Sequence, residues 1–320
     1  MEALGRKSTV AWLSVVSNTS LVLLKLAVGL LIGSVAVMSE AIHSGLDLVA
    51  SVIALFAVRR SDRPADEEHP FGHGKVENLS GAVEALLIFA AAGWIAVEAV
   101  RRLIHAEPLE AAGWGVLVML LSSLVNLGVS HLLFKVGRKT ESVALQADGW
   151  HLRTDVYTSA GVMAGLVLIW VGHRVLPGSN LAWLDPVAAL AVALLILRAA
   201  YSLTVHAGRD LLDTALPAEQ LWIREYIAGL APTVRGYHKL RTRRAGNVRF
   251  VDVHLFARAD LTLEEAHGIS DRVERAIGER FPGSNVTVHM EPCDGVCGPA
   301  CADDCLLEDD ARAALRDSRR

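Results

Sequence analysis

The sequence has little cysteine, no excess of positive charge and no HExxH motif. All four cysteines lie after residue 292, which excludes a disulfide framework for the whole fold and favours a reducing compartment for the tail. The formal net charge of -4 and the sequence pI of about 6.3 give no electrostatic reason to expect nucleic acid as a partner. The missing HExxH argues against a membrane metalloprotease.

Hydrophobic residues make up 52% of the chain and the mean hydropathy is +0.37, yet 21% of the residues are charged. That combination indicates a membrane part and a water-soluble part in one chain. Long apolar runs lie before residue 206, and the charges are concentrated after it. We therefore predict a transmembrane domain over 1–206, a cytoplasmic domain over 207–292 and a cysteine-containing tail over 293–320.

Six apolar stretches each come close to the ~20 residues that a bilayer core requires, so the first domain is expected to be an all-α bundle of six membrane spans. These are predicted at 9–32, 36–58, 77–100, 111–134, 147–173 and 184–205. The lysine and arginine bias of the loops places both termini and the second domain in the cytoplasm of a multi-pass protein of the cell (inner or plasma) membrane. The inward side carries Arg6, Lys7, Arg59, Arg60, Arg63, Lys75, Lys135, Arg138, Lys139 and Arg209, against Arg101, Arg102 and Arg174 outside.

Two HxxxD motifs lie in the spans: His43 with Asp47, and His151 with Asp155. Side chains four residues apart share one face of a helix, one turn from each other. Two such helices facing each other offer two imidazoles and two carboxylates, a set that suits tetrahedral zinc. The charge of the metal also balances two carboxylates that the bilayer would otherwise penalise. The motifs therefore predict a metal site within the membrane.

Other polar residues of the spans leave two interpretations open. Lys25 and Glu84 belong either to a path for ions or protons or to helix packing. Asp148 either guides ions toward His151 or is a carboxylate favoured by the dipole at a helix N-terminus. Asn126 is expected to form hydrogen bonds between helices.

The loop between the second and third spans offers Asp66, His69 and His73 as a second ion site, where an incoming metal would be captured. The alternative is a polar turn shaped by prolines and glycines. In the tail, Cys293, Cys297, Cys301 and Cys305 repeat every four residues. They indicate either a thiolate metal site or a disordered, redox-sensitive tail.

The second domain is predicted to be a small α+β fold with the order αββαβ. The elements are a helix from Pro217 to about Leu230, strands over 234–243 and 248–257, a helix from about Thr262 to Phe281, and a strand over 285–291. Its histidines fall on positions away from the core, and their density indicates either a metal site or solvated surface residues. The candidate ligands are His238, His254, His267, His289 and Glu291.

These features together resemble the cation diffusion facilitator family, above all the bacterial branch typified by the ferrous-iron/zinc efflux pump. The resemblance is carried by the six spans, both HxxxD motifs, the His-rich loop over 64–77, the Asp185-Pro opening of the last span and the histidines of the second domain. It implies a homodimer that exchanges a divalent cation for protons by alternating access. It assigns the HxxxD residues to the transport site, Asp66, His69 and His73 to a loop site, and the five ligands of the second domain to a binuclear site in a metallochaperone-like domain.

Zinc is the expected substrate and regulatory ligand. His43 stands where that branch often carries Asp, and imidazole makes the site less suited to manganese or magnesium. Cadmium, cobalt, nickel or ferrous iron as main cargo are alternatives, and so is a membrane metal sensor or metalloenzyme without transport. Metal binding needs neutral imidazoles and ionised carboxylates, so metal and protons are expected to compete for the same atoms.

Overall fold

The computed structural model describes residues 2–32, 35–104, 113–175, 183–293, 295 and 304–317. The chain divides into two compact units, Met1–Leu211 and Leu212–Arg320. The boundary predicted after residue 206 falls inside the last helix of the first unit, which ends at Leu211. Each unit builds its own core, and each is described separately below.

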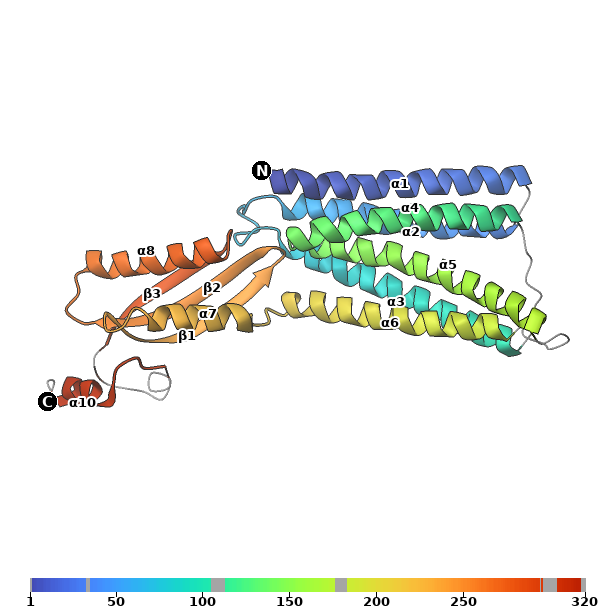
Figure 1. Cartoon of the computed structure of the whole chain (residues 1–320). Helices are drawn as coiled ribbons and strands as arrows, with labels where there is room; N and C mark the ends of the chain where they lie inside the picture. The colour runs from blue at the N-terminus through green and yellow to red at the C-terminus, as the bar shows by residue number, and fades with distance from the viewer. Residues whose placement is uncertain are drawn as a thin grey trace. The chain divides into compact units, whose positions relative to one another are not determined.

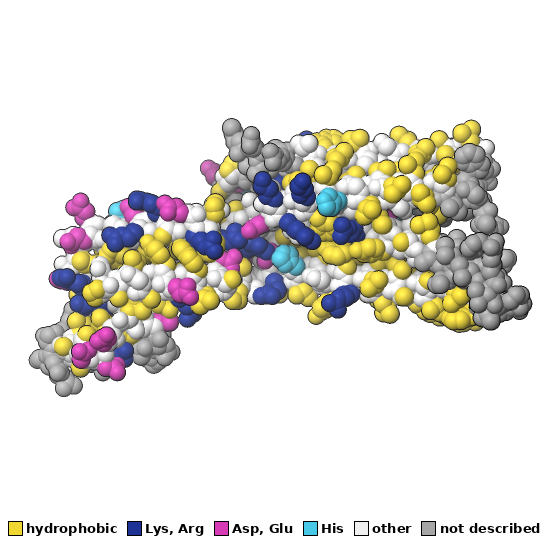
Figure 2. Space-filling model, viewed as in Figure 1, with side chains coloured by type: hydrophobic (Ala, Val, Ile, Leu, Met, Phe, Trp, Pro, Cys, Tyr) yellow, Lys and Arg dark blue, Asp and Glu magenta, His cyan; other side chains and the backbone are white. Residues whose placement is uncertain are grey.

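The first unit consists of long helices that run alongside one another (Figure 1). Five of them are long and apolar enough to cross a membrane within the residues that the structure describes. Many large apolar side chains, such as Leu31, Phe56 and Trp94, are exposed on this unit, and yellow hydrophobic surface covers much of its visible face (Figure 2). A helix bundle that is apolar outside and polar inside fits a lipid environment. The helices are α1 (Glu2–Ile32), α2 (Val35–Ser61), α3 (Lys75–Ile104), α4 (Gly113–Lys139), α5 (Val143–Val175) and α6 (Leu184–Leu211).

The helices pack most extensively in three pairs, α1 with α2, α3 with α6, and α4 with α5. Small residues allow the close approach that the sequence indicates. A Cβ atom at Gly161 on α5 would lie 2.6 Å from Val192 Cγ2 on α6, and one at Gly81 on α3 would lie 2.7 Å from Val143 Cγ1 on α5. Helix α5 is therefore fixed between α3 and α6, which sets the direction of its polar residues.

The second unit has the predicted element order αββαβ, and this prediction is confirmed. Gly246, at φ +60°, and Asn247 form the two-residue turn between β1 and β2, where a positive φ favours glycine. Helix α8 begins with a capping box in which Thr262 and Glu265 satisfy each other's backbone N–H groups. The elements are α7 (Pro217–Ala228), β1 (Val234–Ala245), β2 (Val248–Arg258), α8 (Leu263–Arg280) and β3 (Asn285–Cys293), followed by α10 (Asp309–Asp317).

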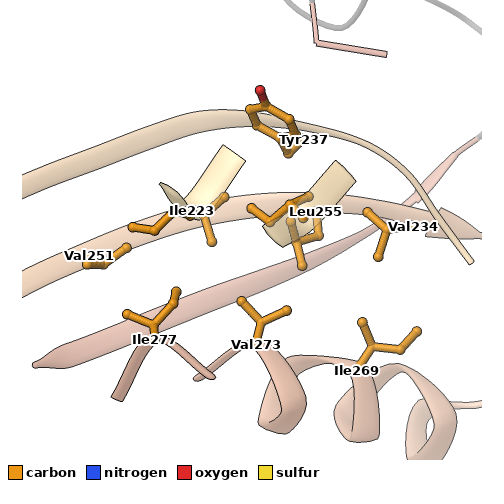
Figure 3. Packing of buried hydrophobic residues seen from close by; sticks show 10 residues of the cluster. Ile223, Val234, Tyr237, Val251, Leu255, Ile269, Val273 and Ile277 are labelled. Atoms are coloured by element: carbon orange, nitrogen blue, oxygen red, sulfur yellow. The ribbon is translucent and has the colours of Figure 1, made fainter. Parts of the chain in front are cut away.

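The sheet has the order β1-β2-β3, with β1 antiparallel and β3 parallel to β2. Parallel strands need a crossover, and α8 provides it. Ile269, Val273 and Ile277 of α8 point toward Val251 and Leu255 of β2 and form the core with them (Figure 3). Because side chains alternate along a strand, the opposite face of the sheet is left for polar residues.

Candidate metal centres

The two HxxxD motifs meet between α2 and α5, and we refer to their four residues as the helix cluster. His151 Nε2 lies 3.0 Å from Asp47 Oδ1, and His43 Nε2 lies 3.7 Å from Asp155 Oδ1. Each imidazole thus pairs with the carboxylate of the other helix. One ligand atom each of His43, Asp47 and Asp155 lies within 4.8 Å of the others, which is the spacing that a single ion between them would need.

A cavity of about 120 Å³ opens at the helix cluster. Asp47 and His151 are buried, whereas His43 is exposed. Asn126 Nδ2 donates a hydrogen bond to Asp155 Oδ2 at 3.4 Å, as expected of a polar residue between helices. The residues that line the cavity are Lys25, His43, Ser44, Asp47, Met119, Ser122, Ser123, Asn126, Asp155, Thr158 and Ser159.

The sequence analysis missed the hydroxyl groups of this cavity. Ser122 and Asn126 are four residues apart on α4, the same spacing that identified the HxxxD motifs, and both line the cavity. Serine is common in membrane helices, so that pattern alone carries little weight. Among the described cationic residues of the spans, Lys25 is the one that lines this cavity, and its Nζ donates a hydrogen bond to Ser44 Oγ at 2.8 Å.

Asp148 lies beside the helix cluster and is fully buried. Ser51 Oγ donates to Asp148 Oδ1 at 2.9 Å, and Asn18 Nδ2 donates to Ser51 Oγ at 2.6 Å. Asp148 is the sixth residue of α5, beyond the first turn in which the helix dipole acts. Asp148 therefore takes part in a hydrogen-bond network between α1, α2 and α5. Glu84, also fully buried, accepts a hydrogen bond from Ser80 Oγ at 3.2 Å.

Asp66, His69 and His73 come together in the loop that follows α2, and we refer to them as the loop cluster. Asp66 Oδ1 lies 3.1 Å from His69 Nδ1, and Asp66 Oδ2 lies 3.3 Å from His73 Nε2. The backbone N–H of His69, which donates to Asp66 at 2.7 Å, holds the pKa of the Asp66 carboxyl below its ordinary value. Gly72, at φ +81°, belongs to the same turn. The loop is therefore both an ordered turn and a group of three possible metal ligands, so the two interpretations of its sequence do not exclude each other.

Three histidines stand side by side across the sheet, because His238 pairs with His254 and His254 pairs with His289 in the strand register. Together with Glu291 they form the sheet cluster. Glu291 is 2.6 Å from His254 Nδ1, 3.2 Å from His238 Nε2 and 3.6 Å from His289 Nε2. The hydrogen bond from His254 holds the pKa of the Glu291 carboxyl below its ordinary value. An ionised carboxylate surrounded by imidazoles is a suitable donor set for zinc.

His267 lies apart from the sheet cluster within the single chain. It is on α8, 73% exposed, with Nε2 at 3.6 Å from Asp271 Oδ1. Helix α8 packs on the core face of the sheet, whereas the sheet cluster occupies the opposite face. The five predicted ligands of this unit therefore do not form one group in the described chain.

The tail cysteines are partly described. Cys293 ends β3, and Cys305 Sγ lies 3.7 Å from the carbonyl oxygen of Arg235. Both thiols are free, whereas Cys297 and Cys301 lie outside the described residues.

Comparisons with known proteins match both units. Residues 11–212 match the family described as the cation efflux transmembrane domain, and residues 217–293 match the cation efflux protein cytoplasmic domain. The cation-efflux pump FieF of Klebsiella pneumoniae is 38% identical over 275 residues, which is 86% of this chain and 89% of the relative. An uncharacterised transporter of Synechocystis is 35% identical over 272 residues, 85% of this chain and 86% of the relative.

Solved structures match parts of the chain. CzrB in its Zn form is 38% identical and covers 26% of this chain and 96% of that chain, with a TM-score of 0.24. A nickel form of the MamM CTD is 28% identical and covers 24% of this chain and 98% of that chain, with a TM-score of 0.22.

Proposed function

The chain belongs to the cation efflux family of transmembrane transporters, and on that basis we propose that it exports zinc in exchange for protons through the helix cluster. Members of this family are transporters rather than enzymes. The observation that carries the proposal is the cross-pairing of the HxxxD motifs: His151 pairs with Asp47 and His43 with Asp155 across α2 and α5. His43, Asp47 and Asp155 also line one cavity. Those groups are ligands for a dication, and they lie where a bilayer would tolerate charge only for function.

The donor set favours zinc as cargo. Two imidazoles and two carboxylates suit a borderline-soft ion that accepts four ligands. Magnesium and manganese prefer oxygen ligands in octahedral geometry, which His43 and His151 disfavour. Cadmium, cobalt, nickel and ferrous iron have overlapping preferences and are the alternative cargoes.

Proton exchange follows from competition at the same atoms. Each carboxylate of the helix cluster has an imidazole partner within 3.7 Å. When the metal leaves, these same groups can bind protons, whose positive charge replaces that of the metal. Rocking of the helix bundle would expose the cluster alternately to the two sides of the membrane. The protein would work as a homodimer in the cell membrane. Both termini are proposed to be cytoplasmic, because α2, α4 and α6 end in basic residues.

The other two clusters are proposed to handle zinc on the cytoplasmic side. The loop cluster would capture incoming ions, since it is mostly exposed and lies directly before α3. The sheet cluster would bind zinc as a regulatory ligand and bring the two soluble domains of the dimer together, with His267 as a further ligand at their interface. The tail thiols would add a weaker thiolate site.

The first test is coupled transport in proteoliposomes that contain the purified full-length protein and a pH-sensitive dye. Zinc added outside is expected to enter and to raise the internal pH, because protons leave in exchange. Magnesium at the same concentration is expected to produce no response. Zinc entry without proton movement would contradict the exchange, and the absence of zinc entry would contradict the transporter itself.

A second test concerns the sheet cluster. Glu291→Gln removes the carboxylate that all three histidines approach, so zinc affinity at this site is expected to fall at least about tenfold. With fluorescent labels on the two soluble domains of the full-length dimer, zinc is expected to increase energy transfer in the wild type but far less in this variant. Glu279→Gln on the exposed side of α8 is the matched control. Equal responses in all three proteins would contradict the regulatory role.

A further inference from the structure

A buried ammonium group forms part of the wall of the transport cavity. Lys25 on α1 is only 5% exposed, and it lines the same cavity of about 120 Å³ as His43, Asp47 and Asp155. Its Nζ donates a hydrogen bond to Ser44 Oγ at 2.8 Å, and Ser44 directly follows His43 on α2. The charge is therefore held beside the ligand-bearing turn of α2 and is not directed toward a membrane surface.

The position of Lys25 argues against a side chain that only snorkels. Such a lysine would extend its ammonium group to a membrane–water interface. Lys25 instead ends at the cavity, and every other cavity-lining residue that the structure describes is neutral, a carboxylate or a histidine. A charge retained inside a membrane domain at this point is expected to act on the ion that the cavity binds.

The charge balance shows the direction of that effect. In a site that holds neither the metal nor the exchanged protons, the ammonium group of Lys25 offsets one of the two carboxylate charges of Asp47 and Asp155. With a dication bound, the two carboxylates already neutralise the metal, and the ammonium group adds an excess positive charge. Lys25 therefore stabilises the empty site and destabilises the occupied one, without being a ligand.

We propose that Lys25 is a positioning residue that keeps the zinc affinity of the transport site low enough for release. The inference rests on the proposed function, because it assigns to Lys25 a part in the same transport cycle. Conduction through a binding site requires that the ion be held firmly enough to enter and weakly enough to leave. A fixed positive charge at the cavity wall weakens zinc binding in every transport cycle and thereby favours release. At an effective dielectric constant of about 20, its repulsion of a dication a few ångströms away corresponds to at least a tenfold change in Kd.

The test compares Lys25→Gln, which retains a hydrogen-bonding group but loses the charge, with Lys25→Arg, which keeps the charge. Both are made in full-length protein that also carries Asp66→Asn and Glu291→Gln, so that zinc titration reports mainly on the transport site. Lys25→Gln is expected to lower the Kd for zinc at least about tenfold. In proteoliposomes it is expected to lower both KM and kcat, because release becomes slow. Lys25→Arg is expected to retain the parental Kd within about threefold.

Matched controls separate this inference from the proposed function. Lys135→Gln, on an exposed position of α4, is expected to leave Kd, KM and kcat unchanged. If the wild-type protein neither binds nor transports zinc, the proposed function fails. If it does both, and Lys25→Gln leaves Kd unchanged or weakens binding, the role of Lys25 is overturned. Should Lys25→Gln fail to fold, Ser44→Ala decides, because it removes the hydrogen bond that joins Lys25 Nζ to α2 beside His43. A Kd at least about threefold lower supports the inference, and an unchanged Kd overturns it.

Discussion

Zinc transport by the Asp155→Asn variant is expected to fall by at least about 100-fold. Loss of a group that only supports a metal ligand already costs roughly 10–100-fold, so loss of a ligand itself should cost at least as much. The amide has almost the shape of the carboxylate and can still accept the hydrogen bond that Asn126 donates at 3.4 Å. It lacks the negative charge that balances the metal and that pairs with His43. The variant is therefore expected to fold but to bind the ion poorly.

The measurement is the initial rate of zinc uptake into proteoliposomes at matched protein content. Glu98→Gln is the control, because it makes the same change of carboxylate to amide on α3, where Glu98 pairs with Arg102 at 3.2 Å on the exposed surface. Its rate is expected to stay within about twofold of wild type. Uptake by Asp155→Asn at the wild-type rate would show that zinc does not pass through the helix cluster.

The sequence could predict half of the geometry of the helix cluster. A spacing of four residues places His43 beside Asp47, and His151 beside Asp155, on any helix. The pairing across helices, with His151 on Asp47 and His43 on Asp155, depends on how α2 and α5 pack. That packing involves contacts between residues far apart in the chain, such as Ser51 of α2 with Asp148 of α5. Periodicity within one helix contains no information about them.

The same limit applies to the sheet cluster. A period of two predicted which face of each strand His254 and His289 would occupy. Their alignment with each other and with His238 depends on the register of a hairpin and of a parallel crossover pair. Sliding β3 by one residue would turn His289 to the other face. His267 has a suitable side chain for a metal ligand but the wrong location. The apolar face of α8 packs on the core side of the sheet, so His267 lies away from the sheet cluster.

A buried ion pair in the helical unit escaped the sequence analysis altogether. Lys7 counted there only as one of the basic residues that orient the spans, yet its side chain is 2% exposed and its Nζ lies 3.0 Å from Glu77 Oε1. Ser61 Oγ donates to the same carboxylate oxygen at 2.8 Å, and Ser142 Oγ donates to the other oxygen. Lys7 and Glu77 lie 70 residues apart in the chain. Single charges near the ends of apolar runs give no signal that they will meet.

Replacing Glu77 with Ala is expected to lower the free energy of unfolding by about 3–5 kcal/mol, because it leaves Lys7 buried without its main partner. Asp62, at 3.6 Å from Lys7, is a poor substitute. Burial raises the pKa of its carboxyl above the ordinary value, although Lys7 opposes that shift. The hydroxyls of Ser61 and Ser142 also lose their acceptor, which adds to the loss. The start of α1, the end of α2, the start of α3 and the residue just before α5 would then lose their common contact.

Thermal unfolding of the full-length protein in detergent, followed by circular dichroism, measures this effect. Glu98→Ala is the control, since it breaks an exposed pair with Arg102 that is expected to contribute no more than about 1 kcal/mol. A double variant, Lys7→Met with Glu77→Leu, separates the cost of an unpaired charge from the loss of the pair itself. Apolar residues of similar volume often replace a buried ion pair at little cost, so the double variant is expected to unfold at a higher temperature than Glu77→Ala. If Glu77→Ala is no less stable than Glu98→Ala, the buried pair does not hold these helices together. If the double variant is no more stable than Glu77→Ala, the loss comes from the serine hydrogen bonds and not from the unpaired ammonium group of Lys7.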